Sequence, residues 1–319
     1  MRIRWLVILA ALLGSTVGPA AADELLRIAA TQRGTWDSAV PELGQRAGIF
    51  KKHGLTLEIL YTQGGAEAQQ AEIAGSCDIA VAIGVDGAIG AFARGAPLRI
   101  IGNEMVGSPD TYWYVPANSP IRTVQDLEGK TISYSVQGSS SHAAVLALLR
   151  QHNVNAKPVA TGNHATTLTM TMTGQIDVGR GAAPIGLDLV EEGRIRIIVR
   201  GSDIKARGDK TVRVLAANLQ TVEKRKDAVA RFIQAYRDTL DWMYSDPTAL
   251  KMYEEFSGNP ERLMRTGRDQ FFPKASMWPD EIKRIDQVLG DAQTMKFIAA
   301  PLTAAQVNDM IQIPAALKK

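Results

Sequence analysis

The chain has 319 residues, and its 36 Lys and Arg residues nearly balance its 33 Asp and Glu residues. Such a small net charge excludes the strongly positive surface with which proteins bind nucleic acid. A chain of this length can bury a large core and exceeds the usual size of one domain, so two lobes are expected. The single cysteine, Cys77, excludes an intramolecular disulfide, and its apolar neighbours in "CDIAVAIG" predict a buried thiol.

The N-terminus has the layout of a secretory signal peptide. Arg2 and Arg4 give a positive start, residues 5–13 form an apolar run, and three alanines end at Ala22. We expect residues 1–22 to be removed by cleavage after Ala22, which places the mature protein in the periplasm. The apolar run is too short to span a bilayer, and no second long apolar run follows it. No cysteine follows the cleavage point directly, so we expect a soluble protein without a lipid anchor.

Strand-like and helix-like segments alternate along the first third of the mature chain. Apolar or alternating runs predict strands at residues 25–31, 55–61, 78–84 and 98–106. Helices are predicted at residues 36–53, where Gly54 would end the helix, and at residues 66–74. This alternation is typical of an α/β domain with a mostly parallel sheet.

The same alternation restarts after residue 129. Further strands are predicted at residues 130–135, 157–161, 176–178, 194–200 and 211–218, and helices after Ser141, from His164 and from residue 219 to 244. The last helix opens a helical tail with breaks near residues 258–260, 272–273 and 278–279. We expect this tail to pack back against the first lobe.

These two sets of elements divide the mature chain into two lobes. We assign residues 23–112 and 213–319 to the first lobe and residues 113–212 to the second lobe. A short internal repeat supports the division, because G-x-x-D stands before an apolar strand in each set, at Gly75 and Asp78 and again at Gly174 and Asp177.

No catalytic or metal-binding motif stands out. The four histidines, at positions 53, 142, 152 and 164, lack the spacing of a zinc site. The segment "GSSSH" differs from the G-x-S-x-G nucleophile elbow, and "GVDGAIG" differs from a dinucleotide-binding loop. We therefore expect no enzymatic activity, no metal and no cofactor. A secreted hydrolase that uses a serine from 139–141 with His142 or His164 stays open as an alternative.

The segment "SYSVQGSSSHAAVLALLRQ" places Gly138, Ser139, Ser140 and Ser141 between a predicted strand and a predicted helix. Free backbone N–H groups and the positive end of the helix dipole attract an anion, and serine hydroxyls add hydrogen-bond donors. We therefore expect residues 138–141 to hold a carboxylate, sulfonate or phosphate. The competing interpretation is one N-cap serine followed by two solvated serines.

The other side of a ligand cleft is expected at the ends of the first-lobe strands. In "ATQRGTWDSAV", Thr31 and Gln32 offer hydrogen bonds, Arg33 offers a charge, and Trp36 offers a stacking surface. Alternatively, Arg33 faces solvent and Trp36 anchors the first helix in the core. The remaining candidates are glycines that permit close approach to a ligand and one arginine of the second lobe: Gly64, Gly65, Gly84 and Arg180. The alternative for Arg180 is an ordinary surface charge.

Four segments occur in an order that resembles a known family. They are "AGIFKKHGLTLEI", "IAGSCDIAV", "DLEGKTI" and "TGQIDV". The chain resembles the periplasmic solute-binding proteins of ABC transporters, specifically the nitrate/taurine/aliphatic-sulfonate group, which includes proteins similar to the thiamine-precursor binders. The resemblance covers residues 26–214, and the helical tail matches only in general character. The cysteine-rich motif of the thiamine-precursor synthases in this superfamily is absent, because Cys77 stands alone.

The resemblance implies a two-lobed periplasmic-binding-protein fold of the second topological type. Two crossover strands would join the lobes near residues 111–117 and 211–217. In this family, three loops line the cleft, and they match residues 31–36, Gly64 with Gly65, and residues 138–141. Such proteins close on a small solute and deliver it to a membrane permease that is driven by an ATPase.

Our leading hypothesis is a monomeric, periplasmic binding protein for a small organic anion, a sulfonate or a carboxylate, with an aromatic ring on the ligand if Trp36 faces the cleft. Arg33 and the serine-rich helix start both suit an oxyanion. A rival within the same class is a binder of a pyrimidine that resembles a thiamine precursor. A ligand sensor for a membrane receptor would use the same binding chemistry.

Overall fold

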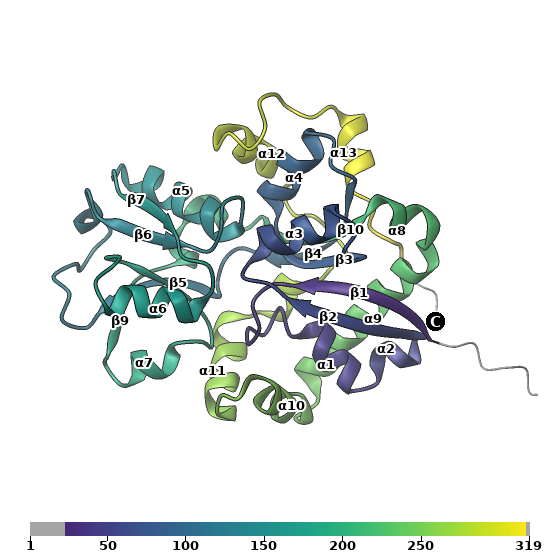
Figure 1. The fold of residues 1–319 in the computed structure, drawn as a ribbon, viewed down its shortest axis with the longest axis horizontal. Coiled ribbons are helices and arrows are strands. Elements are labelled where there is room, and N and C mark those ends of the chain that lie inside the picture. The colour runs from purple at the N-terminus through teal and green to yellow at the C-terminus, as the bar shows by residue number, and fades with distance from the viewer. Residues whose placement is uncertain (1–22, 317–319) are drawn as a thin grey trace, which may run out of the picture.

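The structure is a computed structural model that describes residues 23–316, so the expected signal peptide lies outside the described residues. It has two lobes, each built on a β-sheet with helices on its faces (Figure 1). The helices within residues 23–316 lack the combination of length and apolar character that crossing a membrane requires.

The first lobe contains a sheet that joins segments from distant parts of the chain. Its strand order is β2-β1-β3-β10-β4, with β1 Glu24–Ala30, β2 Leu55–Tyr61, β3 Ile79–Gly84, β4 Leu98–Val106 and β10 Thr211–Asn218. β1 pairs in parallel with β2 and β3, whereas β10 lies antiparallel between β3 and β4. The carboxyl ends of β1, β2 and β3 therefore meet at one edge of the sheet.

The second lobe contains β5 Thr111–Pro116, β6 Thr131–Tyr134, β7 Lys157–Ala160, β8 Gly179–Ala182 and β9 Ile195–Arg200. β6 and β7 pair in parallel, and β5 lies antiparallel between β8 and β9. A parallel bridge from Ile132 to Val178 connects the two parts. The carboxyl ends of β6, β7 and β8 thus share an edge, as those of β1, β2 and β3 do in the first lobe.

Each lobe has one strand that runs against its neighbours, and it is the first strand after the chain crosses between lobes. β5 follows a crossing at residues 107–110, and β10 follows a crossing at residues 201–210. The crossings touch, because the Gly107 N–H donates to the Lys210 carbonyl oxygen at 2.9 Å. The predicted two-lobed fold with mostly parallel sheets is confirmed. Since β5 belongs to the second sheet and β10 to the first, we propose these two crossings as the lobe boundaries.

The helices cover both sheets. In the first lobe they are α1 Val40–Arg46, α2 Ile49–Lys52, α3 Gly65–Ile73 and α4 Val85–Ala93. In the second lobe they are η1 Gln125–Leu127, α5 Ser140–His152, α6 His164–Met172 and α7 Leu187–Glu191, followed on the return crossing by η2 Gly201–Asp203 and η3 Lys205–Arg207. The tail contains α8 Leu219–Lys224, α9 Lys226–Ser245, α10 Thr248–Ser257, α11 Glu261–Phe271, η4 Lys274–Met277, α12 Ile285–Thr294 and α13 Ala304–Met310.

Two predicted elements differ from the structure. The helix expected at residues 36–53 is two helices, α1 and α2, because Gly48 has a left-handed φ of 72° and interrupts the hydrogen-bond ladder. The strand expected at residues 176–178 lies instead at β8, in a glycine-rich segment. In β8 the tyrosine rings of β5 pack directly over Gly179 and Gly181, where a Cβ would collide with them. This close packing against β5, which apolar alternation does not reveal, explains why the strand lies there.

The long helix α9 packs against the first lobe, as expected for the tail, and its apolar side chains share one core with β1 and β2. α11 departs from that expectation because it also contacts the second lobe. Arg262 of α11 forms an ion pair with Glu191 at 2.5 Å, and Gly267 lies against Pro184. Cys77 is buried, as its apolar neighbours predict.

Candidate functional site

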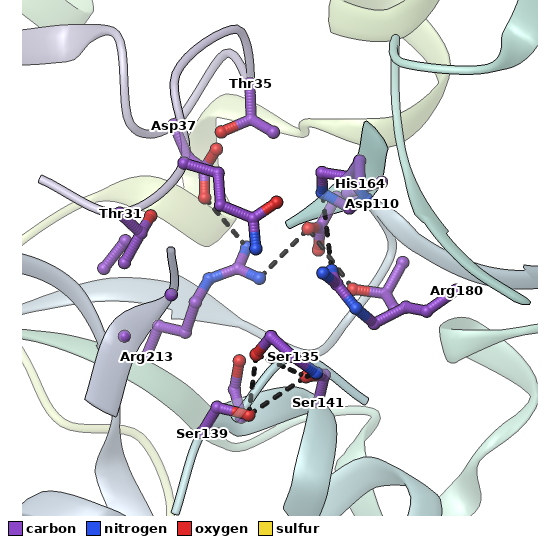
Figure 2. Close-up of a pocket in the computed structure, with 17 residues that line it drawn as sticks. Thr31, Thr35, Asp37, Asp110, Ser135, Ser139, Ser141, His164, Arg180 and Arg213 are labelled. Carbon is purple, nitrogen blue, oxygen red and sulfur yellow. Dashed lines mark hydrogen bonds and ion pairs between the residues drawn. The ribbon is translucent and has the colours of Figure 1, made fainter. Parts of the chain in front are cut away.

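A small cavity, here called the anion cavity, lies between the two lobes where strand ends of both sheets meet (Figure 2). Its volume is about 50 Å³. That is room for about four water-sized groups. Eight of the twelve candidate residues line it: Thr31, Gln32, Gly64, Gly65, Ser139, Ser140, Ser141 and Arg180. These residues follow or belong to β1, β2, β6 and β8, so the common edge of each sheet brings them together.

The serines form the floor of the cavity as it is drawn in Figure 2. Ser139 is the N-cap of α5, and its hydroxyl accepts from the His142 N–H at 3.2 Å. The hydroxyls of Ser135, Ser139 and Ser141 lie 3.0 Å from one another, and all three residues are buried. Ser141 is buried and hydrogen-bonded to Ser135, which contradicts the alternative of one cap followed by two solvated serines, while Ser140 is half-buried and lines the cavity.

The first turn of α5 adds backbone donors. Within residues 23–316, the N–H groups of Ser140 and Ser141 have no backbone acceptor outside the helix, as is usual in a first helical turn. The helix dipole places partial positive charge at the same point. The floor thus offers N–H and O–H donors without a formal charge.

Arg180 supplies the formal charge on the second-lobe side. Its side chain is buried, with Nη1 3.4 Å from His164 Nε2 and Nη2 donating to the Gly162 carbonyl oxygen at 3.4 Å. Among the described residues, no carboxylate forms an ion pair with it, and its Nε has no hydrogen-bond partner. Burial lowers the pKa of Arg180 to about 10, so the guanidinium is still charged at neutral pH. Arg180 is therefore a buried positive charge that no carboxylate pairs directly, although Asp110 lines the same cavity and its charge acts to raise the pKa of Arg180.

His164 lines the cavity beside Arg180, although the sequence suggested it only as the base of a hydrolase. Burial and the neighbouring Arg180 charge hold its pKa well below the usual range, so its ring is neutral. Its Nε2 accepts from Arg180, which leaves the proton on Nδ1, an atom without a partner among residues 23–316. Its place directly after the N-cap Asn163, following β7, is the sequence signal that indicates a cleft position.

The hydrolase alternative finds no support in these contacts. In the described part of the chain, neither His142 nor His164 forms a ring hydrogen bond to a serine hydroxyl. The His142 ring lies 4.5 Å from the Tyr134 ring, and its Nδ1 accepts from the Gly138 N–H. The lowered pKa of His164 also makes it a weak proton acceptor.

The first-lobe side of the cavity contains a buried charge network that the sequence did not suggest. Arg213 of β10 lies 3.2 Å from Asp37, 2.9 Å from Glu104 and 3.0 Å from Asp110. Burial raises the pKa of Glu104 to about 8 and also raises the pKa of Asp37. The three carboxyls hold the pKa of Arg213 well above its usual range. The only sequence signal was one arginine inside the apolar run "TVRVLAAN".

The other four candidates lie outside this cavity lining. Trp36 is fully buried in the core, where its Nε1 donates to the Tyr244 hydroxyl at 3.0 Å, so its expected role as a stacking surface is wrong. Arg33 lies 4.6 Å above the Phe256 ring and lines a neighbouring cavity at the cleft mouth. Gly84 and Gly138 face each other across the lobes: a Cβ on Gly84 would lie 3.1 Å from the Gly138 carbonyl oxygen.

Among residues 23–316, no cluster of three or more His, Cys, Asp or Glu side chains is arranged to hold a metal ion. The site therefore consists of hydrogen-bond donors, two buried arginines and several carboxyls. Such an arrangement suits reversible binding of a small polar molecule.

Solved structures of similar fold include binding proteins and an enzyme. The alkanesulfonate-binding protein SsuA from Xanthomonas axonopodis pv. citri, bound to MOPS, has a TM-score of 0.76 at 20% identity, covering 92% of this chain and 100% of that chain. The nitrate-binding protein NrtA from Synechocystis PCC 6803 has a TM-score of 0.70 at 12% identity, covering 90% and 86%. The desulfurization enzyme DSZB has a TM-score of 0.63 at 14% identity, covering 91% and 96%. At these identities the similarity establishes the fold alone.

Sequence comparison gives the family. No curated protein sequence matches the chain. A family model described as NMT1/THI5 like matches residues 42–250. That match covers about two thirds of the chain, from within α1 through the whole second lobe to α9. It includes the second-lobe side of the anion cavity and part of the first-lobe side, but it begins after β1 and the loop of residues 31–37. The chain therefore belongs to the NMT1/THI5-like family.

Proposed function

We propose that this protein is the periplasmic solute-binding component of an ABC importer. It captures a small organic anion, a sulfonate or a carboxylate, between its two lobes and presents the closed complex to a membrane permease. The similar fold of a sulfonate-binding and a nitrate-binding periplasmic protein supports this role. The volume of the anion cavity supports a compact head group of about four heavy atoms.

The buried charge of Arg180, which forms no ion pair among the described residues, is the observation that carries the proposal. A buried charge without a partner costs several kcal/mol, and the loss is recovered when an anion binds beside it. An oxyanion in the cavity would accept from Arg180 and from the donors of the α5 N-terminus at the same time. Hydrogen bonds that involve two ionised partners are the stronger kind.

The lobes meet closely enough to enclose such a ligand. The Asn163 side-chain amide donates to Gln63 Oε1 across the cleft at 2.6 Å. Contacts of this kind exist only when the lobes are closed, so a ligand held by both lobes stabilises the closed state. A permease that recognises the closed shape would receive loaded protein in preference to empty protein.

A ligand with N–H donors, such as an aminopyrimidine, is a second candidate. Three buried acceptor atoms on the first-lobe side have no partner among the described residues: Gln32 Oε1, Asp37 Oδ1 and Asp110 Oδ1. They would accept from an amino group, whereas a simple anion would leave them unused. Competition between methanesulfonate and an aminopyrimidine for the purified protein separates the two candidates.

Replacement of Arg180 by methionine tests the proposal. We expect methanesulfonate or acetate to raise the melting temperature of the unaltered protein and to leave that of Arg180→Met unchanged. A ligand at a hundred times its Kd adds roughly 2.7 kcal/mol of stability. Without ligand, Arg180→Met should be as stable as the unaltered protein or more so, because a buried unpaired charge is removed.

The matched control is Arg122→Met, which removes an exposed arginine of the second lobe. This control should retain the full ligand-induced shift. An undiminished shift in Arg180→Met, or the absence of any shift with sulfonates and carboxylates in the unaltered protein, would overturn the proposal.

A further inference from the structure

A second cavity adjoins the anion cavity, and its lining is mostly apolar. It has a volume of about 280 Å³ and lies in the second lobe, against β5, β8, α6 and α7. We call it the apolar chamber and define it by Tyr112, Tyr114, Leu168, Ile185 and Leu189, which line it. Neither the binding of an anionic head nor the closure of the lobes uses this space.

Two buried tyrosine rings lie behind one wall of the chamber, with Tyr112 fully buried and Tyr114 3% exposed. Tyr112 and Tyr114 are two positions apart on β5, so their side chains lie on the same face of the sheet, with ring centroids 6.1 Å apart. They stand opposite Gly181 and Gly179 of β8, where any side chain would collide with the rings. The Tyr112 hydroxyl donates to the Ile185 carbonyl oxygen at 2.5 Å, which holds that ring in place.

His164 stands at the junction between the chamber and the ligand cleft. It lines the anion cavity, the apolar chamber and the cavity at the cleft mouth, which has a volume of about 350 Å³. Arg180 lines the first two, so the charged group that would bind an anionic head also borders the apolar space. The Nδ1 proton of His164, on a side chain only 8% exposed, has no partner among residues 23–316.

We infer that the ligand of this protein carries an aromatic ring, joined by a short spacer to its anionic head, and that the ring occupies the apolar chamber. This inference rests on the proposed function, because Arg180 must hold the head. An apolar cavity of about 150 Å³ is enough to take benzene, and the chamber exceeds that volume. The half-buried Leu168 and Ile185 offer the apolar contacts, and the tyrosine rings behind them keep that wall rigid.

Two sulfonates, one of which carries a benzyl group on the methyl carbon of the other, test the inference. Calorimetric titration gives the Kd of methanesulfonate and of 2-phenylethanesulfonate with the unaltered protein. Burial of a phenyl ring should make the second ligand at least tenfold tighter. Equal or weaker binding of 2-phenylethanesulfonate would overturn the inference.

A variant that fills the chamber locates the ring. Leu168→Trp should abolish the gain from the phenyl group and change the Kd of methanesulfonate by less than twofold. Leu60→Trp is the matched control, since Leu60 is exposed on β2 of the first lobe, and it should keep the gain. If Leu168→Trp does not fold, Ala165→Phe at the exposed rim of the chamber makes the same test. A full gain in the filled variant would overturn the inference.

The same titrations separate failure of the inference from failure of the proposed function. If methanesulfonate binds through Arg180 but the phenyl group adds nothing, the chamber is unused and the proposed function stands. If the phenyl ligand binds with equal strength in Arg180→Met and loses affinity in Leu168→Trp, the chamber is used and anion capture is wrong. If neither ligand binds, both are wrong.

Discussion

Each side of the anion cavity contains one buried arginine. One of the two is ion-paired with carboxyls, and the other is not. On the first-lobe side, Arg213 lies within 3.2 Å of three carboxyls. On the second-lobe side, Arg180 contacts only a neutral histidine and a backbone carbonyl among the described residues. Burial lowers the pKa of Arg180, whereas the carboxyls raise that of Arg213.

The contrast indicates a structural role for Arg213 and, under the proposed function, a binding role for Arg180. A buried arginine enclosed by carboxyls is already paired, so its main effect is to hold β10, β4 and the loop after β1 together. A buried arginine without a counter-ion raises the free energy of the empty protein and lowers it again when an anion arrives. Under the proposed function, the first lobe would supply a stable frame and the second lobe the charge that a ligand neutralises.

Removal of the paired arginine should have the largest effect. Arg213→Met leaves buried carboxyls without their cation, and we expect a loss of about 3–5 kcal/mol in the free energy of unfolding. Denaturant titration measures it, with Arg284→Met as the control, because Arg284 forms an exposed ion pair with Asp209. The control should lose less than about 1 kcal/mol. A loss that small in Arg213→Met would contradict the comparison between the two arginines.

An unpaired carboxyl in the first lobe should show a pH effect of intermediate size. Glu72 is fully buried, neither of its oxygens has a partner in the described chain, and burial raises its pKa to about 8. The unfolded chain, with a glutamate pKa of about 4.3, loses that proton first. Stability should therefore fall as pH rises from about 4.3 to about 8, by about 1.4 kcal/mol per pH unit for this group.

Glu72→Gln removes this titration and should gain roughly 2–3 kcal/mol over the unaltered protein between pH 5 and pH 7. Thermal unfolding at several pH values measures the gain. Glu223→Gln, at an exposed position of α8, is the control and should follow the unaltered protein. A constant difference between Glu72→Gln and the unaltered protein across this range would show that Glu72 ionises normally.

The smallest change in free energy is expected for a substitution at Gly84, where the first lobe touches the second. Gly84 has φ −67° and ψ 126°, which any residue adopts, but a Cβ there would lie 2.6 Å from the Ser140 nitrogen of the other lobe. Gly84→Ala should therefore hinder closure and weaken ligand binding about tenfold, or 1.4 kcal/mol, with little change in melting temperature. Gly290→Ala in α12, where a Cβ meets nothing, is the control. Unchanged affinity in Gly84→Ala would mean that closure does not bring these surfaces together.

Much of the fold was predictable because alternation of apolar residues is a local signal. The predicted spans of β2, β4 and β10 coincide with the observed strands. A helix start among the serines was equally local, since capping serines and a preceding glycine are read directly from the sequence, but the N-cap is Ser139, two residues before the predicted start after Ser141. The break at Gly48 was missed because a glycine inside a helical pattern is often tolerated.

The charge network and the chamber were not predictable, because their members come from distant parts of the chain. Asp37, Glu104 and Asp110 meet Arg213 only after β10 has been inserted between β3 and β4. Trp36 was open to two interpretations for the same reason, since the tyrosine that fixes it lies about two hundred residues away. No local pattern distinguishes a paired arginine from an unpaired one.

The hydrogen bond between Gly107 and Lys210 has a practical consequence for engineering. The segment from β5 to β9 enters and leaves the rest of the protein at one point, so it is an insert whose ends are already joined. Arg180, His164 and the serines at the start of α5 all belong to this insert. Exchange of residues 111–200 for those of a relative would transplant the second-lobe half of the cavity as one cassette, while the recipient keeps its own first-lobe half and frame.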